Sequence, residues 1–575
     1  MPDTLLLAEA FWMLEGYFVR TLGMHRVYNS AFMHMLKKED NSSYRYLIKN
    51  TLEFDAEILK RYVNFMNNPD EDTAIAQFGR GDKYFGVCMM MITMPGLPMF
   101  GHGQVEGFTE KYGMEYAKAY YDEQPDEHLV WRHYHEIFPI MKKRPLFAEV
   151  RNFFLYDVYS PEGSVNENIF AYSNRLGNET ALVVFNNCFE QATGWIKTSV
   201  GYRQGDEIRQ SSLLEGLNLS NQDNTYVVFR DHASGMEFIR SCRELSSNGM
   251  LVAVDGYKYN VFLDFREVYP SKLRPYDRLA AELNGRGVES IERAALTMSL
   301  SPLHLLVTAF LAFEHPAPPA TELQEEEEAT ELEKAIALLL DAVAQQFSEL
   351  MELPLSVPEN LASKAAERHR NAAELAGHLS LQKNCKKLQT ALGFSSKEWS
   401  DYYTMTTHYI ILDTIQEMAI SGGILSSNLI DDWLMSDALR EIYPEKGVIG
   451  IPGEHLPDLL VCLLTPKPEA NTDNDKEAHL LAQLKKLYTT NKPHLGRLLQ
   501  FDERHQKVWF REHRFSVLVA WLILKELLNE QEPLTPVEEE HPEATIAEWV
   551  DASEQLDLQA FLAGYEMEEL VRAKE

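Results

Sequence analysis

The sequence is poor in cysteine and in long apolar runs. Its five cysteines lie far apart and form no Cys-x-x-Cys pair, which argues against a disulfide framework and against a cysteine-rich zinc site. We find no apolar run of the roughly 20 residues that a membrane-spanning helix needs. The first residues, MPDTLLLAEAFW, carry no basic segment and no small-residue cleavage site, so they do not resemble a signal peptide. We therefore expect a cytoplasmic protein with no metal site and no cofactor.

Positive charge is also scarce. The chain has 54 Lys and Arg against 87 Asp and Glu, for a formal net charge of -33. Such a chain repels the phosphates of nucleic acids and of anionic membranes, so neither is an expected partner. Its acidity fits a neutral or cationic ligand but selects no function. With 575 residues, 45% of them hydrophobic, the chain can form several domains, each with a core.

Four short apolar runs mark residues 1–146, and segments of helical pattern separate them. The runs are TLLLAEAFW, HRVYNSAFM, YVNFMNN and PGLPMFGHGQ. Apolar strands that alternate with helices are typical of a parallel α/β sheet. Ligands and catalytic groups collect at the carboxyl ends of the strands in such sheets. The polar residues that follow each run are therefore the first candidates for a functional site.

The pattern changes after residue 146. Short alternating runs such as TALVVFNN and KYNVFLDF, separated by Asn, Gly and Asp turns, predict an antiparallel β-sandwich. Stretches rich in proline and glutamate predict solvated linkers, and most of the remainder has a helical pattern. The predicted organisation is a β-sandwich at 147–270, connecting helices at 271–313, an acidic Pro/Glu linker at 314–330, an α-helical domain at 331–530, and an acidic linker with a terminal helix at 531–575.

Two carboxylates follow apolar runs in the first region. Glu9 comes after four apolar residues and before aromatic ones. It is either a glutamate that bonds to backbone at a strand end or a general acid beside apolar side chains. Asp70 follows FMNNP at the end of the third run, and it is either a turn or capping aspartate or a catalytic group. Trp12 has the flat apolar surface on which a sugar ring could stack.

The four runs resemble strands five to eight of the (β/α)8 barrel of the α-amylase superfamily, glycoside hydrolase family thirteen. In that family strand five ends in a glutamate followed shortly by an aromatic residue, as Phe11 and Trp12 follow Glu9 here. The segment PGLPMFGHGQVEGF, residues 95–108, is similar to the family's eighth strand. The resemblance covers residues 1–270 and implies a multidomain fold: the second half of a (β/α)8 barrel at 1–146, a β-sandwich, and an α-helical C-terminal region.

The resemblance also implies roles for individual residues. Glu9 would be the general acid/base, and Asp70 would stabilise the oxocarbenium-like transition state. The residues expected to bind substrate are Trp12, Asn68, His102 and Gln104. One position departs from the family's pattern, because Pro69 stands where the family usually has histidine. Proline has no N–H to offer a sugar hydroxyl, so Asn67, Asn68 or His102 would have to donate that bond, or the first sugar is bound less tightly.

The nucleophile of the resembled family is missing. Retaining hydrolysis needs two carboxyls about 5–5.5 Å apart, and the family takes its nucleophile from strand four, in a Gly-apolar-Arg-x-Asp pattern. This chain begins at strand five, and Asp231 and Asp264, the nearest substitutes, lie in the predicted sandwich. Three explanations stay open: a truncated enzyme, one half of a barrel that another chain completes, or a non-catalytic remnant.

The sequence thus predicts an α-glucan-active retaining glycoside hydrolase or transglycosylase of the α-amylase type, which lacks the nucleophile-bearing half of its barrel and is inactive alone. The expected partners are an α-glucan or another oligosaccharide, and a second chain that supplies the missing half. The alternative is a non-catalytic carbohydrate-binding or interaction protein derived from such an enzyme.

Overall fold

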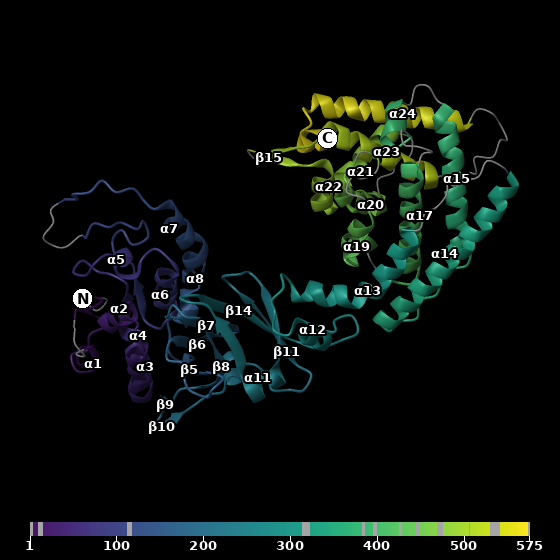
Figure 1. Cartoon of the computed structure of the whole chain (residues 1–575). Coiled ribbons are helices and arrows are strands. Elements are labelled where there is room, and N and C mark those ends of the chain that lie inside the picture. The colour runs from purple at the N-terminus through teal and green to yellow at the C-terminus, as the bar shows by residue number, and fades with distance from the viewer. Residues whose placement is uncertain are drawn as a thin grey trace. The chain divides into compact units, whose positions relative to one another are not determined.

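The computed structural model describes most of the chain (Figure 1). The described residues are 4–9, 15–111, 118–312, 322–381, 386–394, 400–424, 428–443, 449, 451–467, 475–504, 507–529 and 541–572. The chain consists of two compact units, Met1–Ala295 and Leu296–Glu575.

A four-stranded parallel sheet opens the first unit. Its strands, hydrogen-bonded in sequence order, are β1 (Leu7–Ala8), β2 (Arg26–Tyr28), β3 (Tyr62–Phe65) and β4 (Leu97–Met99). The helices among them are α1 (Glu15–Arg20), α2 (Ser30–Lys38), α3 (Asn41–Asp55), α4 (Glu57–Arg61), α5 (Ala74–Phe78) and α6 (Asp82–Thr93). This alternation agrees with the strands predicted from the four apolar runs. Because the strands are parallel, their carboxyl ends share one edge of the sheet. A half-barrel is not confirmed beyond these four strands.

Buried asparagines join the strands of this sheet. Asn29, directly after β2, accepts a hydrogen bond from the Phe32 N–H at 3.3 Å and so begins α2 as its N-cap. Its Nδ2 donates to Asn64 Oδ1 of β3 at 2.8 Å, and Asn64 Nδ2 donates to the Pro95 carbonyl at 3.1 Å. These bonds tie the end of β2, the middle of β3 and the entrance to β4 to one another.

Short helical segments lead from the parallel sheet to a second sheet. They are α7 (Glu127–Arg132), a π-helical turn (His133–Ile137), α8 (Phe138–Met141) and α9 (Arg144–Phe147). Asp126 caps α7 by accepting a hydrogen bond from the Leu129 N–H at 3.2 Å. The turn of π-helix is a feature that helical periodicity in the sequence does not reveal.

The second sheet has eight antiparallel strands in the order β12-β11-β14-β7-β6-β5-β8-β13. The strands are β5 (Phe154–Tyr159), β6 (Ile169–Leu176), β7 (Glu179–Asn186), β8 (Ala192–Ser199), β11 (Tyr226–Asp231), β12 (Glu237–Ser241), β13 (Met250–Val254) and β14 (Tyr259–Val268). Between them lie the hairpin of β9 (Tyr202–Gln204) and β10 (Glu207–Arg209) and the helices α10 (Leu213–Leu217) and α11 (Cys242–Asn248). Figure 1 shows β5 to β8 and β14 side by side.

The predicted β-sandwich is not confirmed, because the strands pair into one continuous curled sheet. Alternating runs are common to both arrangements, and only the pairing of strands distinguishes them. Register shifts between Tyr156 and Val158 and between Val228 and Arg230 interrupt the ladders. Such bulges bend a strand and increase its twist, and the curled sheet encloses a hydrophobic core of its own.

Successive side chains of β6 enter two different hydrophobic cores. Phe170 and Tyr172 belong to the core shared with helices α2, α3 and α6, whereas Ile169 and Ala171 belong to the core inside the curled sheet. The alternation follows from the pleat of a strand, which turns every second side chain to the same face. Both faces of this strand are therefore buried, and the parallel and antiparallel regions share one core.

A fully buried arginine fastens α3 to the antiparallel sheet. Arg45 donates to the carboxylates of Glu167 at 2.7 Å and Asp157 at 2.6 Å. It also donates to the carbonyls of Ile169 at 2.8 Å and Tyr156 at 3.2 Å. Each of the three guanidinium nitrogens thus has an acceptor, which compensates the cost of burying the charge.

Helices dominate the second unit, and its boundary with the first lies inside α13 (Ile291–Leu311), which follows α12 (Tyr276–Leu283). The further helices are α14 (Glu322–Met351), α15 (Leu361–Leu381), α16 (Lys386–Ala391), α17 (Ser400–Ser421), α18 (Leu429–Asp432), α19 (Met435–Ile442), α20 (Leu456–Leu464), α21 (Lys476–Thr490), α22 (Lys492–Leu499), α23 (Glu512–Asn529), α24 (His541–Leu562) and α25 (Met567–Arg572). Strands β15 (Asp502–Arg504) and β16 (Lys507–Trp509) form a hairpin. Of the predicted linker at 314–330, residues 314–321 lie outside the described residues, and α14 begins at Glu322.

Within the described residues, α13 is the one helix that is long and apolar enough to cross a membrane by length and composition. The sequence-based expectation that no such segment exists is therefore not met on this criterion. In the structure, 39% of its apolar window is buried, and Leu300, Leu303 and Val307 pack into the core of the second unit. A core helix passes the same test, so composition alone does not assign α13 to a membrane.

Candidate active site at the edge of the parallel sheet

The two predicted catalytic carboxylates lie at one edge of the parallel sheet. Glu9 directly follows β1, and Asp70 lies in the loop after β3. Since β1, β2 and β3 are parallel neighbours, both residues follow the carboxyl ends of strands, separated by the end of β2. This is the placement that the strand pattern predicts. The chemical roles of both residues stay predictions.

The pKa of Tyr28, the last residue of β2, depends on the charges of both carboxylates. Its pKa is raised first by partial burial of the phenol and then by the negative charges of Glu9 and of Asp70. The ring also packs against Phe65 of β3, with 5.4 Å between the ring centroids. Tyr28 ends the strand that lies between β1 and β3, so it belongs to the same edge of the sheet as Glu9 and Asp70. The sequence analysis did not select Tyr28, and its position at the end of an apolar run was the one available signal.

Asn68 shapes the loop that carries Asp70. Its Oδ1 accepts hydrogen bonds from the backbone N–H groups of Asp70 at 3.0 Å and Glu71 at 2.9 Å, as an Asx turn does. The Lys111 ammonium donates to the Asp70 carbonyl at 2.6 Å. Asn68 Nδ2 is buried and has no hydrogen-bond partner in the part of the chain that the structure describes. The predicted substrate-binding role of Asn68 stays a prediction, since its side chain is buried in the described structure.

Gln104 is buried beneath the loop after β4. Its Oε1 accepts from the Gly101 N–H at 3.0 Å, and its carbonyl accepts from the Tyr84 hydroxyl at 2.8 Å. Its side chain is 2% exposed, so Gln104 holds the loop and does not face solvent. Gly101 lies against the Asn67 amide, and a Cβ there would come within 2.4 Å of Asn67 Oδ1. Only a residue without a side chain fits, which brings the β3 and β4 loops close together.

The other predicted substrate-binding residues are differently placed. His102 is exposed at the loop after β4, with its ring 6.4 Å from that of Phe108. Trp12 lies outside the described residues. Of the four predicted residues, the structure therefore offers His102 on the surface, whereas Asn68 and Gln104 are buried.

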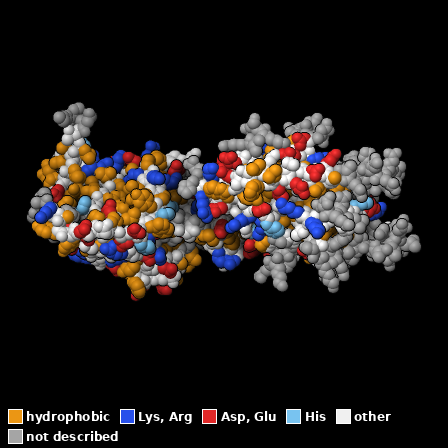
Figure 2. Space-filling view, turned by 90° about the horizontal axis from the view of Figure 1, so that it is seen from above, with side chains coloured by type: hydrophobic (Ala, Val, Ile, Leu, Met, Phe, Trp, Pro, Cys, Tyr) orange, Lys and Arg blue, Asp and Glu red, His pale blue; other side chains and the backbone are white. Residues whose placement is uncertain are grey.

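The candidate site is open to solvent. Glu9 and Asp70 are both exposed. Three leucines are exposed as well: Leu5 just before β1, Leu7 in β1, and Leu97 in β4, the other edge strand. Figure 2 shows many hydrophobic side chains on one face of the first unit, at the left of the view. Parallel sheets are normally covered on both faces, whereas these leucines lie at the surface of the described structure.

The substitutes for a nucleophile lie elsewhere. Asp231 is buried in β11 and accepts hydrogen bonds from Ser234 and from the Val261 N–H. Asp264 lies in β14, where its positive φ of 56° marks the irregular pairing with β11. Neither follows a strand of the parallel sheet. Within the described residues, no group of three or more His, Cys, Asp or Glu side chains could hold a metal ion.

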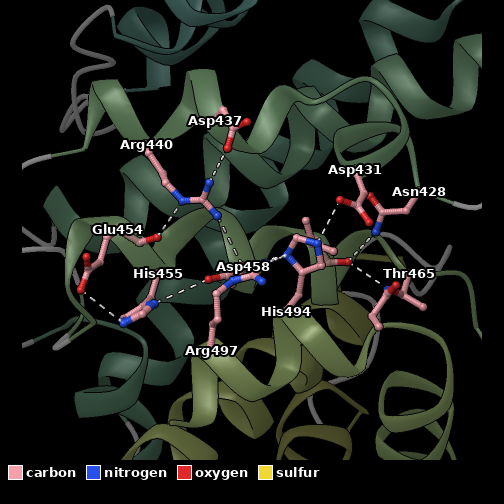
Figure 3. A network of polar contacts seen from close by, with 12 residues as sticks. Asn428, Asp431, Asp437, Arg440, Glu454, His455, Asp458, Thr465, His494 and Arg497 are labelled. Carbon is pink, nitrogen blue, oxygen red and sulfur yellow. Dashed lines mark hydrogen bonds and ion pairs between the residues drawn. The ribbon is translucent and has the colours of Figure 1, made fainter. Parts of the chain in front are cut away.

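A second polar cluster lies inside the helical unit (Figure 3). His494 of α22 contacts two carboxylates: its Nδ1 lies 2.7 Å from Asp458 of α20 and its Nε2 lies 3.0 Å from Asp431 of α18. Arg497 donates to the same Asp458 oxygen at 2.8 Å and 3.0 Å. Both imidazole nitrogens are occupied, so His494 has none left to act as a base, and the cluster holds three helices together.

The charged groups in this cluster stabilise one another in their ionised forms. Burial alone would raise the pKa of Asp458, but hydrogen bonds from His494 and Arg497 lower it below its usual value. Burial would likewise lower the pKa of His494, but Asp431 and Asp458 raise it above its usual value. The structure thus favours a positively charged His494 between two negative carboxylates.

No protein-family model matches the chain, and no curated protein matches its sequence. Solved structures match it over about half of its length. They include the α-amylase of Geobacillus thermoleovorans in complex with acarbose (14% identity, 46% of this chain and 54% of that chain, TM-score 0.31) and a cyclomaltodextrin glucanotransferase with a three-domain ABC distribution (16% identity, 46% and 51%, TM-score 0.31). The debranching enzyme of Nostoc punctiforme, soaked with acarbose, is a third (12% identity, 45% and 50%, TM-score 0.32).

The chain is similar in structure to enzymes of the α-amylase family. The chain spans about half the length of the solved structures that it matches.

Proposed function

We propose that the carboxyl edge of the parallel sheet is one part of the active site of an α-glucan-active retaining glycoside hydrolase or transglycosylase. Glu9 acts as the general acid/base, and Asp70 stabilises the positive charge that develops on the sugar ring. The observation that supports the proposal is that Glu9 and Asp70 follow the carboxyl ends of parallel strands β1 and β3, on either side of β2.

Within the residues that the structure describes, the proposed site lacks a nucleophile. A retaining mechanism needs a nucleophilic carboxylate about 5–5.5 Å from the acid/base, and among the described residues neither Asp231 nor Asp264 lies at this edge. The exposed Glu9 and Asp70 are hydrated, whereas catalytic electrostatics act most strongly where water is excluded. Further parallel strands beside β1 or β4, from a second chain or a further segment, would supply the nucleophile and cover the exposed leucines.

A test compares the chain alone with the chain completed by four βα units of an active α-amylase, added as a separate polypeptide or as a fusion. The chain alone should not hydrolyse maltoheptaose measurably. The completed protein should do so, and Glu9→Gln should lower its kcat by about 10² to 10⁴-fold, the usual contribution of general acid/base catalysis. Asp70→Asn should also lower kcat. Full activity of Glu9→Gln would refute the assignment.

The second candidate function is a non-catalytic carbohydrate-binding protein. The observation that favours it is the exposure of Glu9 and Asp70, which suits binding better than proton transfer. This reading predicts that the chain alone binds maltoheptaose, and that completion with further strands adds no hydrolysis.

A further inference from the structure

A hollow of about 320 Å3 lies on the outer side of α7 and the π-helical turn. Its lining residues are Pro125, Glu127, Val130, Trp131, Tyr134 and His135. Its volume is at the lower end of the range for small-molecule sites, and it is too small to be a protein interface of usual size. None of the residues assigned to the sheet-edge site lines it.

Two aromatic rings of the hollow are held in fixed orientations. The His135 ring stacks on the Trp131 indole, with 4.2 Å between centroids and 23° between planes. His135 Nδ1 lies 2.8 Å from the Trp131 carbonyl, and because a carbonyl only accepts, Nδ1 is the protonated nitrogen and Nε2 points away from this bond. This hydrogen bond keeps the two rings parallel and reduces the entropy that a ligand would otherwise lose in ordering them.

A third ring, that of Tyr134, stands three positions after Trp131. The Tyr134 ring packs edge-on against Phe138, with 5.1 Å between centroids and 78° between planes. Trp131 is 56% exposed and Tyr134 is 62% exposed, although both rings are oriented by their neighbours. Exposed aromatic side chains that are already rigid are typical of binding surfaces.

The chemistry of the lining selects the ligand. Neither lysine nor arginine is among the described lining residues, and Glu127 adds a carboxylate, so a phosphorylated or otherwise anionic ligand is disfavoured. The accessible surface of the hollow is almost entirely apolar, and aromatic rings make up much of its lining. The apolar face of C–H groups on a pyranose ring matches such a surface, and the sugar hydroxyls would stay in water.

We propose that this hollow is a binding site for a sugar ring of a neutral oligosaccharide, which stacks on Trp131 and contacts Tyr134. The choice of an α-glucan as that oligosaccharide rests on the proposed function, whereas the stacking of a neutral sugar does not. An organic cation is the competing ligand, since cations also bind aromatic faces. Aromatic cages bind cations between rings that face one another, whereas Trp131 and His135 lie flat in one stack. This arrangement favours the sugar.

The test titrates the full chain with maltoheptaose, cellohexaose and choline by isothermal titration calorimetry. Trp131→Ala and Tyr134→Ala should each weaken oligosaccharide binding at least about tenfold, as central aromatic contacts do. Tyr269→Ala, which removes another exposed aromatic ring of the first unit, is the matched control and should leave the affinity unchanged.

Each outcome decides between the two proposals. Binding of cellohexaose but not maltoheptaose, lost in Trp131→Ala, supports the hollow and contradicts the α-glucan class. If Glu9→Gln abolishes binding and Trp131→Ala does not, the sugar binds at the sheet edge, and the proposal for the hollow is wrong. Binding of choline alone, or of none of the three probes, would also overturn it.

Discussion

The guanidinium of Arg45 and the carboxylate of Asp157 lie 2.6 Å apart, although 112 positions separate them in the chain. Arg45 is completely buried, and it joins a helix of the parallel region to a strand of the antiparallel sheet. Arg45→Met should lower the free energy of unfolding by about 3–5 kcal/mol, because it leaves buried acceptors without a donor. Denaturant titration of the first unit's transition measures the loss.

The matched control for Arg45 is Lys49→Met. Lys49 also pairs with Asp157, at 2.8 Å, but its side chain is 25% exposed. The change should cost about 1 kcal/mol or less, since water can replace the lost partner. Equal effects of the two substitutions would contradict a special role for the buried arginine.

Gly86 should not tolerate a side chain. A Cβ at Gly86 would come within 2.1 Å of the Phe185 ring, so Gly86→Ala must push α6 away from β7. We expect a loss of about 1–3 kcal/mol in the free energy of unfolding, typical of an overpacked core. Gly81→Ala, five positions earlier, meets nothing within 4 Å and should change stability by about 0.5 kcal/mol or less.

The pKa of Tyr28 tests the geometry of the sheet edge without an activity assay. Negative charge on Glu9 and Asp70 contributes to the raised value, so Glu9→Gln and Asp70→Asn should each lower the pKa of Tyr28. An NMR titration of the tyrosine ring carbons, assigned with Tyr28→Phe, measures this shift. Glu207→Gln, on the distant hairpin strand β10, is the control. If the pKa of Tyr28 is unchanged in both Glu9→Gln and Asp70→Asn, the two carboxylates do not lie near the phenol.

The stability of the helical unit should depend on pH through His494. The pKa of His494 is raised in the folded state. Its contribution to the free energy of unfolding is therefore fully present below its pKa in the unfolded chain, about 6.5, and is lost as pH rises through its pKa in the folded state. His494→Gln should therefore cost roughly 1.5–3 kcal/mol at pH 6, the range for hydrogen bonds to charged groups, and less at higher pH.

Denaturant unfolding of the wild-type chain and of His494→Gln at several pH values isolates this effect, because the other titrating groups are the same in both proteins. Asp458 acts in the opposite sense: its lowered pKa gives stability that is present above the unfolded value of about 3.9 and lost as pH falls. A constant difference between the two proteins from pH 5 to 9 would show that His494 does not titrate in this range.

The parallel sheet could be predicted from sequence because its strands are local signals. Each apolar run ends in polar residues, and parallel strands bring those ends together whatever the helices between them do. Glu9 and Asp70 were found in this way. Tyr28 was missed because a tyrosine at a strand end has no pattern of its own, and only its neighbours in space make it informative.

Long-range pairing could not be predicted in the same way. The alternating runs after residue 146 identified strands, yet whether they form one sheet or two depends on contacts such as those of β14 with β7 and β11. Arg45 and Gln104 also have hydrogen-bond partners that are distant in sequence: the Arg45 guanidinium donates to Asp157, and the Gln104 backbone carbonyl accepts from the Tyr84 hydroxyl. The sequence predicted a substrate contact for Gln104 and gave Arg45 no role.

The two-sided burial of β6 has a consequence for folding. A strand whose odd and even residues belong to different cores cannot lose one core without exposing half of its side chains, so both cores should melt in a single cooperative transition. Amide protons of Phe170 and Ala171 should then exchange only through global opening of the first unit. A boundary at residue 146 describes the sequence pattern, but a fragment ending there should not fold autonomously.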